Sequence, residues 1–534
     1  PGTASFDPGA AGSVTLDTQA NLFGTVGVTQ GVDASFRDAN AIILGATSIS
    51  GNLVVTTDAG GITQSGALVI PGTSSFSATS GVITLTTGTN NFTGAVTLTN
   101  TGGSPVSITD TNGITIGQTS VTGALTIDGG GVSELGSTGT VACNGIFSAT
   151  AAGNLTISNP ISNGAFGVTI TTSAAMYRIY LNYTGTVVQT DGGAVTFSRR
   201  VVLQQNSTID TDAVGGNTNA GNVTFSNTVN AETAGTQSLA VDVSADGTGT
   251  GGTVTFSNSI GATAALSGLT VSGATTATLG VIGGGSAGVT GATSITASTS
   301  ITLSGITYNA NTQTYDAGGN TISLTAGAAV TFTSSDDDIT FNGTVDLANG
   351  SNLSITTGAA TVGNVTMGAV TANSNETVTI AAGDGSVTIG AVGTANQILS
   401  VSLSGSLGIT LNGTIITSST AAANGVTITG PVILGADVTI NTSAGNGAVS
   451  FSGATSTINS AVAQSLTVNA GTGAVTFGGA IGASTALSAF TVSAAATASL
   501  ANIGGGSAGV TGITSISASS SITLSGTVYN ANQQ

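Results

Sequence analysis

Charged residues are the scarcest class in this sequence. Its 534 residues include no lysine and no histidine, and only four basic residues stand against 22 acidic ones, which gives a net charge of −18. The basic residues are Arg37, Arg178, Arg199 and Arg200. Contact with phosphate backbones or anionic lipid surfaces needs clustered basic side chains. We therefore expect the chain to bind neither nucleic acid nor an anionic membrane.

Long apolar runs and cysteine pairs are also missing. Ser, Thr, Asn and Gly interrupt every hydrophobic stretch before it approaches the roughly 18 to 20 residues of a spanning helix, so we expect no membrane insertion. The single cysteine excludes an intrachain disulfide. Hydrophobic residues nevertheless make up 40% of the sequence. That share is enough for a core and too large for an intrinsically disordered chain.

Internal repeats dominate what is present. Residues 260–311 match 481–532 at a constant offset of 221, with 38 identities in 52 positions. In the first third a shorter period pairs 35–55 with 107–127. We expect a solenoid segment with units of about 71 residues over 1–185, a repeat module over 186–416, and a second, incomplete copy of that module over 417–534. Because the last copy stops mid-repeat, we expect a piece of a longer array.

Short alternating strands recur inside the repeats. The pattern x-V-T-F or x-L-T-I follows turns rich in Gly, Asn or Asp, as at Gly94, Gly123, Asp384 and Thr472. Alternation of apolar and hydroxyl side chains is typical of a strand with one buried face, and no segment shows helical spacing. Tandem repeats with turns of variable length favour a solenoid over a sandwich. We predict an all-β rod, a parallel β-helix with three short strands per coil, stacked about 4.8 Å apart.

The decapeptide IGGGSAGVTG occurs at 282–291 and again at 503–512. In the first copy Gly283, Gly285 and Gly288 satisfy the G-x-G-x-x-G pattern of a dinucleotide loop. Such a loop needs a following helix and an acidic residue about 20 positions on. A β-pattern follows both copies, and neither has an acid at that distance. We therefore expect a repeated solenoid turn, with glycines at positive φ, and no cofactor.

Three other features are candidate sites. The acidic run Asp336, Asp337 and Asp338 is either a weak Ca²⁺ site, because hard cations prefer several oxygen ligands, or a solvated turn. Cys143 aligns with a turn and is either a small filler or an exposed thiol. Arg199 and Arg200 align with a Gly-Pro turn at 430–431, which favours a solvated turn over a basic binding patch.

The segment 176–183 is the one aromatic cluster in the sequence. Its residues Tyr177, Arg178, Tyr180 and Tyr183 form the best candidate contact surface, for stacking on sugars or for packing against a neighbouring rod. The alternative is irregular packing in the core.

The repeats resemble those of the filamentous haemagglutinin family of very large secreted bacterial proteins. The resemblance rests on the segments 36–76 and 90–117 and on the GAVTF, QSLTV and YNANTQTY series of the later modules. It implies a right-handed β-helical shaft, export across the outer membrane, and a role at the cell surface or in a matrix.

Parallel β-helices also include polysaccharide lyases and hydrolases, but this composition argues against catalysis. Proton abstraction needs a base, and hydrolysis needs two carboxylates across a cleft, whereas most acids here are scattered singly. We expect a non-enzymatic structural or adhesive shaft, extracellular or on a bacterial cell surface, whose partners are other copies of itself or cell-surface and glycan ligands. The alternatives are a protomer of a laterally associated sheath or matrix, and a polysaccharide-binding or polysaccharide-degrading β-helix.

Overall fold

The computed structural model describes residues 2–212, 219–245, 247–284, 288–373, 375–419, 425–505 and 509–534. Their regular secondary structure is entirely β-strand, and the strands stack in parallel through about 22 turns of a β-solenoid. The predicted all-β solenoid is therefore confirmed. The described part of the chain contains no helix long and apolar enough to cross a membrane. The chain divides into two compact units, Pro1–Thr275 and Thr276–Gln534, whereas the three-part division based on repeats stays a prediction.

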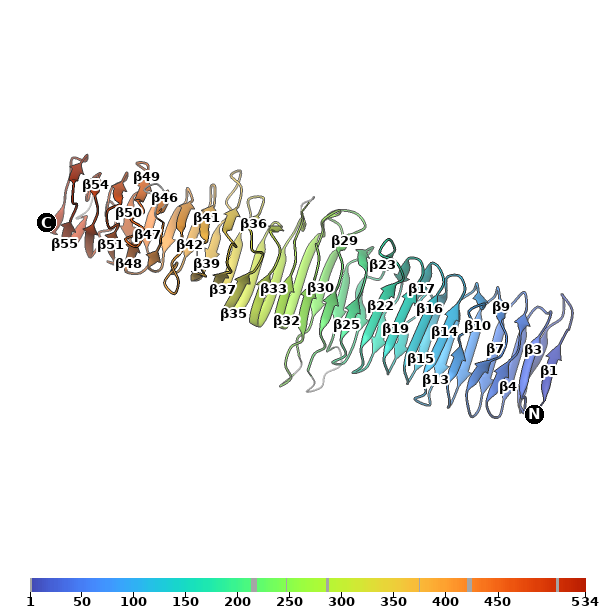
Figure 1. The fold of residues 1–534 in the computed structure, drawn as a ribbon. Helices are drawn as coiled ribbons and strands as arrows, with labels where there is room; N and C mark the ends of the chain where they lie inside the picture. Colours follow the sequence, from blue (N-terminus) through green and yellow to red (C-terminus); the bar gives the residue numbers. More distant parts are fainter. Residues whose placement is uncertain are drawn as a thin grey trace. The chain divides into compact units, whose positions relative to one another are not determined.

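Unit 1 consists of parallel stacks in which each strand pairs with its counterpart in the next coil. Figure 1 shows β4, β7, β10 and β13 side by side in this way. The first stack comprises β2 (Val14–Asn21), β4 (Ala34–Asp38), β7 (Leu53–Thr57), β10 (Ser74–Ala78), β13 (Val96–Asn100), β15 (Thr115–Val121), β18 (Val141–Cys143), β21 (Ile161–Asn163), β24 (Gly185–Gln189), β27 (Ser207–Asp210), β30 (Ser238–Asp242) and β32 (Gly268–Leu279). The second comprises β1 (Thr3–Phe6), β3 (Thr25–Val28), β5 (Ile42–Leu44), β8 (Ile62–Gln64), β11 (Ile83–Leu85), β14 (Val106–Asp110), β16 (Leu125–Gly129), β19 (Phe147–Ala151), β22 (Val168–Thr172), β25 (Val195–Phe197), β28 (Val223–Phe225) and β31 (Thr253–Phe256). Two shorter stacks comprise β6 (Thr47–Ser48), β9 (Leu68–Ile70) and β12 (Asn91–Phe92), and β17 (Ser133–Leu135), β20 (Leu155–Ile157), β23 (Arg178–Leu181), β26 (Arg200–Leu203) and β29 (Val229–Ala231).

Unit 2 has three stacks of the same kind. The first comprises β34 (Thr307–Asn309), β36 (Val330–Thr333), β38 (Leu353–Thr356), β41 (Thr377–Ala381), β43 (Ser400–Ser404), β46 (Val426–Thr429), β49 (Val449–Ser452), β52 (Ala474–Phe477), β54 (Thr497–Leu500) and β56 (Ser521–Leu524). The second comprises β33 (Thr293–Leu303), β35 (Gln313–Leu324), β37 (Ile339–Leu347), β39 (Val365–Met367), β42 (Ser386–Ile389), β44 (Gly408–Leu411), β47 (Val432–Leu434) and β50 (Ile458–Ser460). The third comprises β40 (Val370–Ala372), β45 (Ile415–Ile416), β48 (Val438–Asn441), β51 (Ser465–Asn469), β53 (Ala489–Ala494), β55 (Val510–Ile516) and β57 (Ala531–Gln533).

The V-T-F strands form the interior as their alternation predicts. In β28, Val223 and Phe225 are fully buried while Thr224 between them reaches the surface. Register then places like residues on top of one another, because Phe225 pairs with Phe197 of β25 and with Phe256 of β31. The three rings stack nearly parallel, with centroids 5.1 and 4.8 Å apart. An aromatic ladder therefore lines this stretch of the unit 1 interior.

Coil length varies along unit 1. Adjoining coils pair Ala34 with Leu53 near the start of unit 1 but Val223 with Val254 near its end, so the later coil is more than half as long again. The shorter sequence repeat of unit 1 is also not a whole number of coils. It aligns Phe76 with Phe147, yet these lie in β10 and β19, which belong to different stacks. Similar sequence therefore recurs on different sides of the solenoid.

The two copies of the decapeptide form the same corner of unit 2. Ile282 bridges to Tyr308 and Ile503 to Tyr529, and each tyrosine hydroxyl accepts a backbone N–H three residues earlier, at 2.8 and 2.7 Å. Both copies lead into strands, β33 and β55. The first and last glycines of each G-x-G-x-x-G have positive φ, as predicted for a turn: Gly283, Gly288, Gly504 and Gly509. The middle glycines, Gly285 and Gly506, lie outside the described residues.

Candidate functional site

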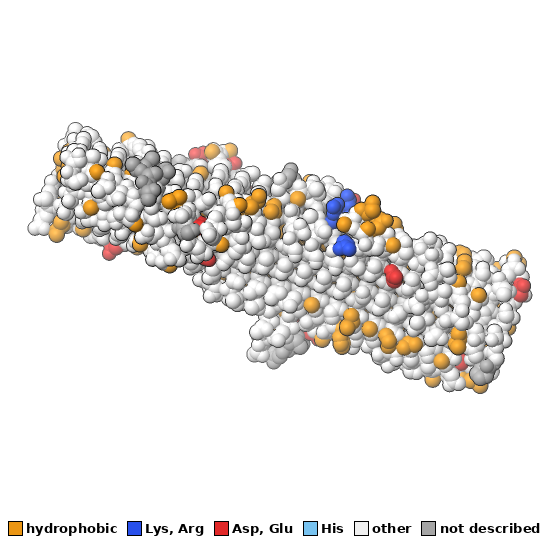
Figure 2. All heavy atoms as spheres, viewed as in Figure 1, with side chains coloured by type: hydrophobic (Ala, Val, Ile, Leu, Met, Phe, Trp, Pro, Cys, Tyr) orange, Lys and Arg blue, Asp and Glu red, His pale blue; other side chains and the backbone are white. Residues whose placement is uncertain are grey.

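Two of the four arginines meet on an outward face of unit 1. Strand β23 lies beside β26, and the register pairs Arg178 with Arg200. Ile179 and Leu181 are buried, so Arg178 and Tyr180 point outward. Neighbouring strands lie about 4.8 Å apart, which places two positive charges side by side. Figure 2 shows basic side chains gathered in one place, over the strands that Figure 1 labels β23 and β29.

Arg178 and Arg200 line a groove with a volume of about 570 Å³. Apolar Val202 and Ala231 also line it, together with the exposed carboxylate of Glu232 and the small residues 262–264. This volume falls within the range of pockets that take small ligands. The groove is therefore a concave surface in which a small ligand can reach both arginines.

Two amide side chains that line this groove each have one hydrogen-bonding atom without a partner in the described residues. Asn227 Oδ1 accepts the Thr228 N–H at 2.9 Å, and Asn258 Nδ2 donates to the Ser226 carbonyl at 3.2 Å. In the described part of the chain, nothing pairs with Asn227 Nδ2 or with Asn258 Oδ1. A third amide, Asn230, has a structural role, since its Oδ1 accepts the Thr263 N–H and fixes the opposite wall. The groove thus offers one free amide donor and one free amide acceptor.

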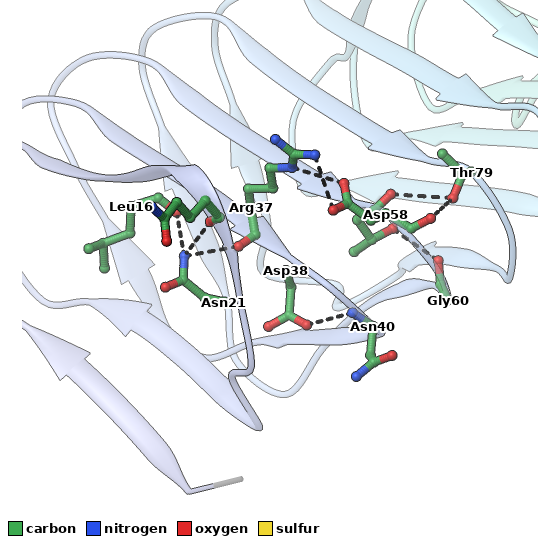
Figure 3. Close-up of polar contacts among 10 residues, drawn as sticks. Leu16, Asn21, Arg37, Asp38, Asn40, Asp58, Gly60 and Thr79 are labelled. Carbon is green, nitrogen blue, oxygen red and sulfur yellow. Dashed lines mark hydrogen bonds and ion pairs between the residues drawn. The ribbon is translucent and has the colours of Figure 1, made fainter.

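Arg37 shows how this solenoid neutralises an exposed arginine. Its Nε and Nη2 donate to the two carboxylate oxygens of Asp58 in the next coil, at 2.9 and 3.1 Å (Figure 3). This hydrogen-bonded ion pair raises the pKa of Arg37. Within the described ranges, the guanidinium groups of Arg178 and Arg200 have no such partner.

The prediction that Arg199 and Arg200 both lie in a turn is right for Arg199 and wrong for Arg200. Arg199 lies in a bend, as predicted, and its guanidinium donates to the Thr172 and Ser198 carbonyls at 3.0 and 3.3 Å. Arg200 is not in the turn but opens β26. The alignment with the Gly-Pro turn at 430–431 was misleading, because β26 begins at the aligned position itself whereas β47 begins only after the proline.

The aromatic cluster is divided by β23. Tyr177, Tyr180 and Tyr183 are all half-buried, and only Tyr180 lies within the strand, on the same face as Arg178. Tyr180 pairs in register with Val202, which lines the groove. Arg178 and Tyr180 therefore flank one surface, while Tyr177 precedes the strand and Tyr183 follows it. The role of these residues in contacts stays a prediction.

The acidic run binds the next coil rather than forming a cage. Asp336 Oδ1 accepts the Ala360 N–H at 2.8 Å, and Asp338 Oδ1 accepts the Asn364 N–H and Nδ2–H at 2.8 and 3.0 Å. Asn364 Oδ1 in turn accepts from Ser386 in the following coil. In the described ranges no three or more His, Cys, Asp or Glu side chains lie close enough together to hold a metal ion. Two of the three carboxylates thus have a structural role that the sequence did not reveal.

Replacing Asp338 by alanine is expected to lower the free energy of unfolding by about 1 kcal/mol, the usual net value of a lost hydrogen-bonding group. Asp337→Ala is the matched control, because the Asp337 carboxylate makes no hydrogen bond within the described residues, and we expect no measurable change. Thermal unfolding with and without millimolar CaCl₂ checks both points. A calcium-dependent rise in Tm that Asp338→Ala removes would support the calcium interpretation.

Cys143 is buried, as the filler alternative predicts, but it is not in a turn. It ends β18, and its thiol contacts the carbonyls of Gly123 and Gly145 at 3.2 and 3.3 Å. Burial raises the pKa of this thiol. An exposed, cross-linking thiol is thereby excluded in the folded chain.

Comparison with known proteins gives one partial match. Residues 31–99 match a family described as repeats of unknown function (DUF5649). The matched stretch lies in unit 1, from just before β4 into β13. No curated protein and no solved structure matches the chain. Together with the solenoid, the match supports a β-repeat protein.

Proposed function

We propose that this chain is a non-enzymatic segment of an extracellular structural or adhesive solenoid, similar to filamentous haemagglutinin repeats and displayed on a bacterial surface. The main support is the stacking of coils within each unit. Each coil contacts only its neighbours, so such a structure lengthens by adding repeats without any change to its core. The net charge of −18 also disfavours lateral pairing of strands at neutral pH.

A laterally associated sheath is the second candidate, and exposed apolar side chains on unit 1 favour it. Val132, Ile146 and Phe166 are 70%, 63% and 45% exposed. A polysaccharide-degrading β-helix receives less support. Burial raises the pKa of Tyr308 and Tyr315 well above the usual tyrosine value, but both side chains lie in the interior of unit 2.

Antibodies raised against this chain are expected to label intact source cells without permeabilisation. Immuno-electron microscopy should then show label along single fibres that project from the surface, because a shaft has no lateral partner. Parallel arrays of fibres would instead favour the sheath. Label seen only after permeabilisation would contradict an extracellular role.

A further inference from the structure

We propose that the groove lined by Arg178 and Arg200 binds an acidic polysaccharide through the carboxylates of uronate sugars. This inference rests on the extracellular role proposed above, since such polymers are met outside cells. It goes further by naming the ligand class and the residues that bind it.

The arginine pair is the first reason. Like charges directly opposite one another on adjacent strands destabilise a sheet, and here two guanidiniums lie in register without an acid bonded to either in the described part of unit 1. The chain has 22 acids and could neutralise them, as Asp58 neutralises Arg37. An external anion would remove the repulsion. The planar guanidinium fork matches a carboxylate with two parallel hydrogen bonds.

The rest of the groove favours a sugar over other anions. Asn227 Nδ2 and Asn258 Oδ1 offer a donor and an acceptor to hydroxyl groups. Glu232 adds an exposed carboxylate that accepts hydroxyl hydrogens. The half-buried ring of Tyr180, whose register partner Val202 lines the groove, supplies an apolar surface for a sugar ring. Carboxylate, hydroxyl and apolar contacts together are the chemistry of a uronate.

The carboxylates of a second copy of this acidic chain are the competing occupant. They would satisfy the arginines, and the Ser and Thr hydroxyls of that copy would suit the free amide atoms of Asn227 and Asn258. Each copy carries a net charge of −18, however, so two copies repel one another more strongly than one copy repels a short oligosaccharide. The sugar is therefore the favoured occupant.

The test is isothermal titration of the full 534-residue chain with a galacturonic acid hexamer at about 0.15 M salt, where surface charges are screened beyond about 8 Å. We expect binding that weakens at least tenfold in Arg178→Gln and in Arg200→Gln, and that is lost in the double variant. Arg37→Gln removes the same charge elsewhere in unit 1 and should bind as the wild type does. Circular dichroism of each variant checks that the fold is retained.

Two further probes separate carboxylate from sugar. The methyl-esterified hexamer and a hexaglutamate peptide should each bind at least tenfold more weakly than the hexamer. Equal binding of the ester, equal binding of the peptide, or no binding of the hexamer would each overturn the proposal. Self-association that the double variant abolishes, without uronate binding, would assign the groove to a second copy. Surface labelling of cells is unaffected by any of these results, so failure here leaves the proposed function standing.

Discussion

Phe225→Ala is expected to lower the free energy of unfolding of unit 1 by about 3 to 5 kcal/mol, the usual cost of truncating a buried phenylalanine. Phe225 is fully buried and stacks on Phe197 and on Phe256. Its loss opens a cavity in the middle of the ladder and removes two ring contacts at once. The coil above and the coil below both pack against this position, so neither can close the gap without leaving its own register. Urea-induced unfolding followed by circular dichroism measures the change.

The same strand supplies the control. Thr224→Ala alters an outward side chain and should change the free energy by no more than about 0.5 kcal/mol. Phe197→Ala should cost less than Phe225→Ala, because Phe197 stacks on one ring of the ladder rather than two. Hydrogen exchange should show the loss of protection concentrated in β25, β28 and β31, since repeat coils open locally. Equal stabilities of Phe225→Ala and Thr224→Ala would contradict the ladder.

Strand positions were predictable because alternation is a local property. The alternating motifs that start at Gly94, Gly123, Asp384 and Thr472 each lead into a strand two residues later, namely β13, β16, β42 and β52. Successive side chains of a strand point to opposite faces whatever its neighbours are, and in β28 this alternation buries Val223 and Phe225. The solenoid class followed from the same pattern together with the repeats.

Register between coils was not predictable from the sequence, and this is why the contacts that the candidate residues make with neighbouring coils were missed. Turns gain or lose residues, so the step from Ala34 to its partner Leu53 is much shorter than the step from Val223 to its partner in β31. The register that pairs Arg178 with Arg200 depends only on the number of residues in the coil between them. The hydrogen bonds of Asp338 to Asn364 in the next coil depend equally on coil length, so the acidic run alone did not reveal them. A contact between two coils leaves no pattern in the sequence of either coil.

The repeated decapeptide gives the second large effect. Gly288→Ala and Gly509→Ala are each expected to lower the free energy of unfolding of unit 2 by about 2 to 5 kcal/mol. Both glycines have φ of +67°, which costs an alanine about 1 to 2 kcal/mol. An added Cβ would also overlap the Asn309 carbonyl in the first copy and the Asn530 carbonyl in the second.

Because of those carbonyls, each substitution should cost more free energy than the positive φ of the glycine alone would cause. The Asn309 carbonyl accepts the Val289 N–H, and the Asn530 carbonyl accepts the Val510 N–H, both at 3.2 Å. Moving either carbonyl away from a new methyl group therefore breaks a hydrogen bond that joins the corner to the next coil. The same substitution thus weakens the stack as well as the turn.

Two other glycines separate the cost of a positive φ from the cost of the steric overlap with a carbonyl. Gly318 has φ of +59° but open space around its Cβ position, so Gly318→Ala should cost only about 1 to 2 kcal/mol. Gly88 has neither a positive φ nor a neighbour within reach, and Gly88→Ala should be neutral or stabilise slightly. In thermal unfolding, Gly288→Ala and Gly509→Ala should lower the Tm most, Gly318→Ala should lower it less, and Gly88→Ala should leave it unchanged or raise it slightly. If Gly288→Ala melted with Gly318→Ala, the close approach of the next coil at this corner would be wrong, and only the bend of the chain would require glycine.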